Sequence, residues 1–226
     1  MKKPTPKRVN NNPLIMFWNF LWKDDSIWST IVLVIISFIL IKYLFLPFVG
    51  LILGTKYPIV AVVSGSMDHA LDMSRGQYGE ICGETRKEVL ESYSTDLEDW
   101  WGVCGGWYTN KGITKEGFDE FPIRNGFKRG DIIILRGKEP ENINIGDIIV
   151  FRSSNKDPII HRVVIIDREG ENRYFQTKGD HNADINSGIQ EERIEPSRII
   201  GVALLRVPWL GYVKIKAVEF YDSIRR

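Results

Sequence analysis

An almost uncharged apolar stretch over residues 26–55, SIWSTIVLVIISFILIKYLFLPFVGLILGT, most constrains what this chain of 226 residues can fold into. Its one charge is Lys42. At a rise of 1.5 Å per residue, about 20 apolar residues cross the hydrocarbon core of a bilayer. Residues 27–47 meet this requirement, and Lys42 is close enough to one end to reach the headgroups. We therefore expect residues 26–55 to be a transmembrane anchor, with a break in the helix at Pro47.

Neither a buried core helix nor a cleaved signal peptide fits this stretch as well. Core helices of globular proteins seldom run this long without a polar face. The stretch also exceeds the apolar region of a cleaved signal peptide and begins too far from Met1. Residues 1–23 carry only basic charges, and this pattern predicts a cytoplasmic N-terminus with residues 56–226 across the membrane. Residues 1–25 then form a basic cytoplasmic head, in which the aromatic segment 13–22 lies at the interface.

After the anchor, the pattern changes to short runs of Ile and Val bounded by Gly, Pro, Asn or Asp. This alternation is typical of strands joined by turns. It predicts a mainly β soluble domain over residues 56–213, followed by an amphipathic tail at 214–226. The expected strands lie within residues 57–67, 131–137, 147–153, 159–167, 173–180 and 198–207.

Residues 68–126 interrupt the β pattern and read as a helical insertion. Apolar residues recur at helical spacing over 84–103, which predicts a helix there. Cys82 and Cys104 flank this segment; the sequence leaves open whether they are free or form a disulfide.

Composition excludes several classes of function. The formal net charge of +1 gives no reason to expect nucleic acid as a partner. The two cysteines and three histidines show none of the spacings of zinc sites, so no metal is expected.

Three short phrases carry the candidate chemistry. Ser64-Gly65-Ser66-Met67 follows an apolar run, and a serine needs a base to become a nucleophile. His161, within IIHRVV, can accept a proton near neutral pH. The phrase TKGDHNAD, residues 177–184, supplies carboxylates that can orient an imidazole. Taken singly, each phrase is better described as an ordinary turn or strand.

Together the phrases resemble type I signal peptidases, especially the archaeal and endoplasmic-reticulum branch. SGSM resembles the nucleophile box of that family, NIGDIIVF the strand box before the base, IIHRVV the base box and TKGD the acidic box. The order of the boxes and the single N-terminal anchor agree as well. The resemblance covers about residues 27–67 and 127–213, and it implies a signal-peptidase-like β fold.

The resemblance also implies roles for individual residues. Ser66 would be the nucleophile and His161 its general base. The Ser64 side chain and the Ser66 amide would hold the oxyanion. Asp180 aligns with the acid of TKGD, and a second acid a few residues later can only be Asp184. We favour Asp184 as the residue that orients His161 and keep Asp180 beside it.

The chain departs from the family pattern at two positions. His69 stands where the family usually has Pro, and His181 stands where it usually has Asn. By chemistry alone both are rival bases to His161, which the resemblance favours.

The function that the resemblance implies is removal of signal peptides from exported preproteins by acyl-enzyme chemistry, without metal or organic cofactor. The expected partners are signal peptides, membrane lipid and the protein-translocation machinery, and the expected location is the cell membrane. Two alternatives remain. A self-cleaving repressor uses Lys as base and lacks an anchor, unlike this chain. A non-catalytic, membrane-tethered β module that binds exported proteins would use Ser66 and His161 only as turn and strand residues.

Overall fold

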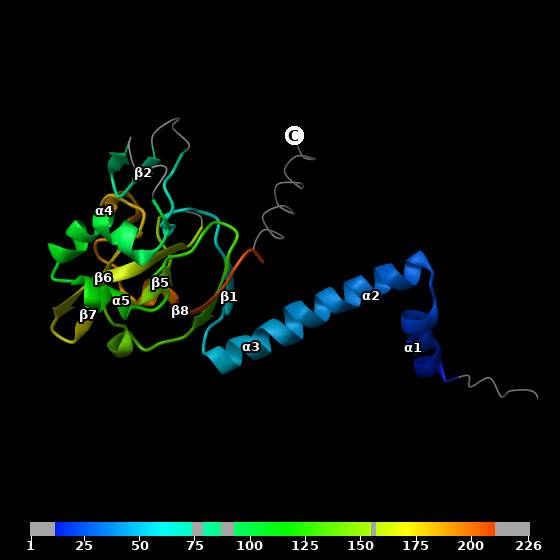
Figure 1. Cartoon of the computed structure of the whole chain (residues 1–226). Helices are drawn as coiled ribbons and strands as arrows, with labels where there is room; N and C mark the ends of the chain where they lie inside the picture. The colour runs from blue at the N-terminus through cyan, green and yellow to red at the C-terminus, as the bar shows by residue number, and fades with distance from the viewer. Residues whose placement is uncertain (1–11, 74–78, 87–92, 155–156, 211–226) are drawn as a thin grey trace, which may run out of the picture. The chain divides into compact units, whose positions relative to one another are not determined.

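The structure is a computed structural model that describes residues 12–73, 79–86, 93–154 and 157–210 (Figure 1). The chain divides into two compact units, Met1–Val49 and Gly50–Arg226. The expected tail at 214–226 and the first eleven residues of the expected head lie outside the described residues.

The first unit is helical. Its elements are α1 (Pro13–Lys23), α2 (Ile27–Leu40), the π-helical turn η1 (Ile41–Phe45) and α3 (Leu46–Leu53), whose last residues belong to the second unit. The side chain of Asn12 caps α1 and that of Ser26 caps α2. Within the described part of the chain, Ile27–Leu53 is one continuous helix that is long and apolar enough to cross a membrane.

The expected break at Pro47 is wrong, because the helix continues through this residue. The turn before it widens, so that the amide of Leu46 donates to the carbonyl of Ile41, five residues back. Such a π-turn relieves the crowding that a proline ring causes in a regular helix. Pro47 is also the second residue of α3, a position where a missing N–H is tolerated.

The second unit contains a six-stranded antiparallel sheet, so the prediction of a mainly β domain is confirmed. Every expected strand segment overlaps one strand of it, and β6 and β7 extend one or two residues beyond the expected limits. The order across the sheet is β1-β4-β8-β5-β6-β7. The strands are β1 (Ile59–Ala61), β4 (Ile132–Arg136), β5 (Ile148–Phe151), β6 (Ile159–Glu169), β7 (Asn172–Lys178) and β8 (Ile199–Val207). The 3-10 turns η2 (Pro140–Asn142), η3 (Ser187–Ile189) and η4 (Pro196–Arg198) lie in the connections.

Side chains alternate between the two faces of the sheet, and both faces are buried. On β5, Ile148 and Val150 join one apolar cluster, while Ile149 and Phe151 join another. The first cluster also contains Met67, directly after the candidate nucleophile. The packing thus fixes the backbone that leads away from Ser66.

The insertion contains a hairpin of β2 (Gly79–Ile81) and β3 (Glu84–Arg86), then α4 (Leu97–Thr109) and α5 (Lys115–Asp119). The helix expected over 84–103 therefore begins later and ends later. Asp96 caps α4 by accepting from the amide of Asp99. The helix runs past Cys104 because aromatic residues beyond it, such as Tyr108, pack into a third apolar cluster with Val164 of β6.

Cys82 and Cys104 form a disulfide, which answers the question that the sequence left open. The bond joins the β2–β3 hairpin to α4 and closes a loop with a sequence separation of 22 residues.

We predict that the double variant Cys82→Ala/Cys104→Ala lowers the free energy of unfolding by about 3 kcal/mol, since a cross-link restricts the unfolded chain. Thermal unfolding of the full chain in detergent checks this, with reductant on the unsubstituted chain as the matched comparison. An unchanged midpoint in both samples would contradict the stabilising role.

Candidate active site

Ser66 lies in a tight turn just after β1. The turn is closed by the amide of Asp68, which donates to the carbonyl of Gly65 at 2.9 Å. A Cβ on Gly65 would meet no other atom within 4 Å, so the backbone before Ser66 faces open space. The Ser66 side chain is partly exposed, as a nucleophile that meets a polypeptide substrate must be.

His161 faces Ser66 from β6. Its Nε2 lies 3.0 Å from Ser66 Oγ, although β1 stands at one edge of the sheet and β6 next to the other edge. The sheet must therefore curl to bring these two strands together. The His161 ring is 3% exposed, so its orientation is set by the protein rather than by solvent.

Glu191 contacts the other nitrogen of this ring. Its Oε2 lies 2.5 Å from His161 Nδ1 and also accepts from the hydroxyl of Thr177 at 3.0 Å. Its Oε1 accepts from the amide of Asn186 at 2.7 Å. An ionised carboxylate only accepts hydrogen bonds, so Nδ1 carries the proton. In the neutral ring, Nε2 is then the acceptor that faces the Ser66 hydroxyl.

Neither acid expected beside His161 lies there. Asp184 is on the surface, where its Oδ1 accepts from the indole of Trp107 at 2.9 Å. Asp180 is fully buried and pairs with Arg162, whose NH2 group lies 2.7 Å from its Oδ2. The expectation that one of them contacts His161 Nδ1 is thus corrected, because the chain continues through η3 and brings Glu191 to this position.

No motif marked Glu191, and sequence reasoning missed it. The spacing argued against Asp184, since the family pattern places the second acid near Asn186, but it did not reach as far as Glu191. The left-handed backbone of Gln190, with φ of 57°, turns the chain directly before Glu191 and aims the side chain inward.

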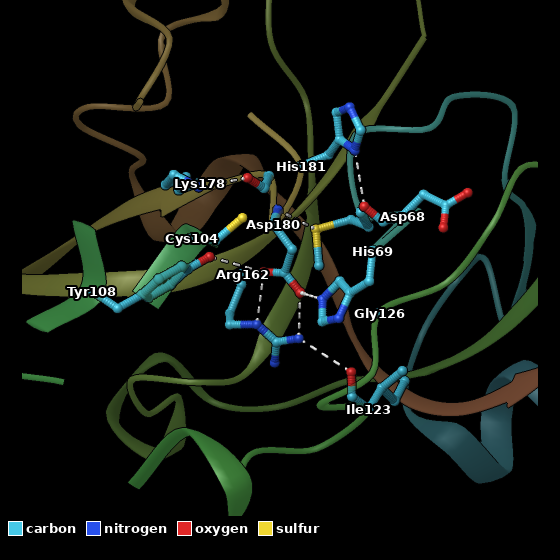
Figure 2. A network of polar contacts seen from close by, with 12 residues as sticks. Asp68, His69, Cys104, Tyr108, Ile123, Gly126, Arg162, Lys178, Asp180 and His181 are labelled. Carbon is cyan, nitrogen blue, oxygen red and sulfur yellow. Dashed lines mark hydrogen bonds and ion pairs between the residues drawn. The ribbon is translucent and has the colours of Figure 1, made fainter. Parts of the chain in front are cut away.

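Arg162 anchors a buried polar network around Asp180 (Figure 2). Its guanidinium donates from Nε to Asp180 Oδ1 at 2.9 Å and from NH2 to Oδ2. Its remaining donors reach the backbone carbonyls of Pro122, Ile123 and Gly146 at 3.0–3.1 Å. All five donors of the group are therefore satisfied, which a fully buried arginine requires.

Each oxygen of the Asp180 carboxylate accepts a further hydrogen bond. The hydroxyl of Tyr108 donates to Oδ1 at 3.1 Å, and His69 Nε2 lies 3.2 Å from Oδ2. Burial alone would raise the pKa of Asp180, but the charge of Arg162 and the hydrogen bonds from His69 and Arg162 hold it well below its usual range. Burial and the neighbouring Asp180 raise the pKa of Tyr108 well above its ordinary value, so its hydroxyl remains a neutral donor.

The two rival histidines have other contacts. His69 is buried, and its ring stacks on Trp100 with centroids 4.1 Å apart. His181 Nδ1 lies 3.0 Å from the backbone carbonyl of Asp68. Both rings point to groups other than the Ser66 hydroxyl, which lies against His161.

A groove leads to Ser66 along β1. A cavity of about 330 Å³ is lined by Ser64, Ser66, residues 60–63 and residues 157–161. The Ser64 hydroxyl lies 3.2 Å from Ser66 Oγ, at the end of this cavity. A second hollow of about 510 Å³ continues from it toward Tyr57. The described residues contain no group of His, Cys, Asp and Glu arranged to hold a metal ion.

We predict that Gly179→Ala strongly reduces reaction of Ser66 with a serine-directed acylating probe. A Cβ on Gly179 would lie 2.6 Å from the Ser66 carbonyl and 2.9 Å from His161 Nε2, so one of the two must move. A displacement of about 1 Å can lower a rate by roughly 100-fold. Gly102→Ala, at an exposed position of α4 where a Cβ would meet no atom within 4 Å, is the control, and equal labelling of both variants would refute the close approach.

We predict that Asp180→Asn lowers the free energy of unfolding by about 3–5 kcal/mol, because it leaves the buried charge of Arg162 unpaired. The folded-state pKa of Asp180 is depressed, so its contribution is present above the ordinary carboxyl pKa of about 4 and is lost as the pH falls below it. Denaturant titrations at several pH values check this, with the exposed Asp167→Asn as control. The difference from the unsubstituted chain should shrink progressively as the pH falls below about 4, and a difference that is as large at pH 2 as at pH 7 would argue against the ion pair.

Comparisons with known proteins found relatives over part of the chain. No family model matches the chain. It is 33% identical over 98 residues to the signal peptidase complex catalytic subunit SEC11 of Pyricularia oryzae, which is 41% of this chain and 57% of the relative. It is 33% identical over 94 residues to human SEC11C, which is 39% of this chain and 49% of the relative.

The corresponding subunit of Verticillium alfalfae is 32% identical over 98 residues. The chain thus spans about half the length of the curated relatives that it matches. These relatives confirm the resemblance predicted from the sequence motifs: the homologues of this chain are catalytic subunits of signal peptidase complexes.

Proposed function

We propose that this chain is a membrane-anchored serine endopeptidase with a signal-peptidase-like fold that removes signal peptides from exported preproteins. The observation that carries the proposal is the chain of contacts from Ser66 Oγ through the His161 ring to Glu191. The similarity to signal peptidase catalytic subunits supports the substrate class.

In the proposed reaction, His161 Nε2 takes the proton of the Ser66 hydroxyl as Oγ attacks the scissile carbonyl. The imidazolium that forms is stabilised by Glu191, which accepts from Nδ1. His161 then gives the proton to the leaving amine, and water hydrolyses the acyl-enzyme with His161 again as base. No other proton carrier is needed.

The oxyanion is proposed to bind the Ser66 amide and the Ser64 hydroxyl. Ser64 Oγ lies 3.2 Å from Ser66 Oγ, so a hydroxyl donor is available beside the carbonyl under attack. Removing one such donor typically costs about 3 kcal/mol of transition-state stabilisation.

The substrate is proposed to bind as an added strand. β1 is an edge strand whose one partner in the sheet is β4, and the groove to Ser66 runs along it. An extended peptide can hydrogen-bond to such an edge, while the apolar lining of the groove receives its alternate side chains. Shallow pockets for small side chains before the cut follow from the family resemblance.

The anchor would keep the enzyme beside its substrates. Ser66 follows Leu53, the last residue of the apolar helix, by 13 residues, so chain length alone keeps it within about 45 Å of that helix. Signal peptides are apolar helices in the same bilayer. We propose a cytoplasmic N-terminus, with membrane lipid and the translocation machinery as further partners and without nucleic acid, metal or organic cofactor.

We predict that Ser66→Ala abolishes cleavage of a preprotein in vesicles and labelling by a serine-directed acylating probe, because the nucleophile is lost. Ser94→Ala, an exposed serine of the insertion, is the matched control. A Ser66→Ala chain that still processes the preprotein would refute the proposal. An unsubstituted chain that never reacts with the probe would favour a non-catalytic binding module.

We predict that Glu191→Gln lowers kcat by roughly 100-fold or more while KM changes little, since a neutral amide neither stabilises the imidazolium nor fixes the tautomer. Asp184→Asn, at the surface acid that the sequence favoured, should retain most of the activity. Steady-state cleavage of a signal-peptide substrate measures both. The reverse ranking of the two variants would return the orienting role to Asp184.

A further inference from the structure

The short segment after the nucleophile is fixed at four successive carbonyls. The first is that of Ser66, which accepts from the amide of His181 at 2.9 Å. The third is that of Asp68, which accepts from Nδ1 of the same residue at 3.0 Å. A carbonyl can only accept, so His181 Nδ1 carries a proton. One residue thus holds the turn that presents Ser66 at two of its carbonyls.

The remaining two carbonyls are held from other segments. Met67 accepts from the amide of Phe127 at 3.0 Å, and His69 accepts from the hydroxyl of Tyr93 at 2.7 Å. The first approach is so close that a Cβ at Gly126 would lie 2.1 Å from the Met67 carbonyl. Gly126 also has φ of +61°, a conformation that a side chain disfavours.

The His69 ring connects this segment to the Asp180 network. Its Nε2 lies 3.2 Å from Asp180 Oδ2 and must donate, because an ionised carboxylate only accepts. One face of the ring lies parallel to Trp100, with an interplanar angle of 5°. Among the described residues, its buried Nδ1 has no hydrogen-bond partner. The ring is therefore oriented by two contacts, the carboxylate and the indole.

These contacts link the turn after Ser66 and the turn around Asp180 at two points. From Ser66 the chain runs to His69, whose ring contacts Asp180 (Figure 2). The residue after Asp180, His181, donates from its amide to the Ser66 carbonyl. Gly179, on the other side of Asp180, is the residue that closely approaches both Ser66 and His161. Movement of the Asp180 turn would therefore displace the nucleophile relative to its base.

We propose that His69 and His181 are positioning residues for Ser66, which hold the nucleophile turn against the Asp180 turn at the distance that His161 requires. This inference rests on the proposed function and assigns to the insertion, which begins at residue 68, a role in that same site. Both residues stand where the family pattern has Pro or Asn, so the two side-chain hydrogen bonds, from His69 to Asp180 and from His181 to the Asp68 carbonyl, depend on residues that depart from that pattern.

The groups that face His69 explain why it is not a base for Ser66. The Nε2 of His69 donates to the Asp180 carboxylate, which also accepts hydrogen bonds from Arg162 and Tyr108. Trp100 covers the ring face. A proton accepted by Nδ1 would have no partner among the described residues, and the ring lies away from the substrate groove.

The test compares two substitutions at each histidine in the full chain. His69→Phe keeps the stack on Trp100 and removes the hydrogen bond, while His69→Gln keeps a donor. His181→Met and His181→Gln form the corresponding pair. Thr109→Val, which deletes a hydroxyl–carbonyl bond within α4, controls for loss of a hydrogen bond elsewhere in the insertion.

The readouts are the rate of acylation of Ser66 by a small acylating probe, kcat and KM for a signal-peptide substrate, and the thermal midpoint. We expect His69→Phe and His181→Met to lower the acylation rate and kcat by roughly tenfold or more, with KM within about twofold. The Gln variants should recover most of this loss, and Thr109→Val should match the unsubstituted chain.

Two results would overturn the proposal: normal acylation in His69→Phe, or equal losses in the Phe and Gln variants. If His69→Phe does not fold, Tyr93→Phe is the substitute, because it removes only the hydroxyl that donates to the His69 carbonyl. An unchanged acylation rate in Tyr93→Phe would count against the positioning role. The probe reports on Ser66 without a signal peptide. A chain that acylates normally but cleaves no preprotein would therefore refute the proposed substrate and leave this test intact.

Discussion

The buried ion pair between Arg162 and Asp180 determines the geometry of the site. Arg162 follows the candidate base directly in β6, and Asp180 lies between the two residues whose backbones approach Ser66. The pair therefore sets the distance between the strand that carries the base and the turn that supports the nucleophile. Such a pair is stable only when every donor and acceptor is satisfied, and here they are, with donors from the insertion completing the carboxylate.

This network explains why the insertion folds where it does. Its histidine, tyrosine and tryptophan side chains pack over a polar centre, and the disulfide joins its hairpin to α4. Two successive residues of β6, His161 and Arg162, point to opposite faces and are both buried, because the insertion covers the face that would otherwise meet solvent. A domain without this cover would leave Arg162 and Asp180 in water.

The sequence predicted the local elements well and their junctions poorly. Runs of Ile and Val located all six strands of the large sheet, and the apolar stretch located the long helix. The continuation through Pro47 depends on a π-turn that has no residue signature, and the shifted limits of α4 depend on packing with β6.

For the site, motif order identified Ser66 and His161, which lie in contact. Their catalytic roles remain predictions. Glu191 could not be found by spacing, because η3 and the left-handed Gln190 set where the chain returns to the histidine.

The central claim is that Ser66, His161 and Glu191 act as one nucleophilic unit. The most direct test is an experimental structure of the full chain with a peptide boronate, which mimics the tetrahedral intermediate. We expect a bond from boron to Ser66 Oγ, His161 Nδ1 within hydrogen-bond distance of Glu191, and a boronate oxygen facing the Ser66 amide and the Ser64 hydroxyl. An adduct on another residue, or a His161 ring turned toward Asp180 or Asp184, would contradict the claim.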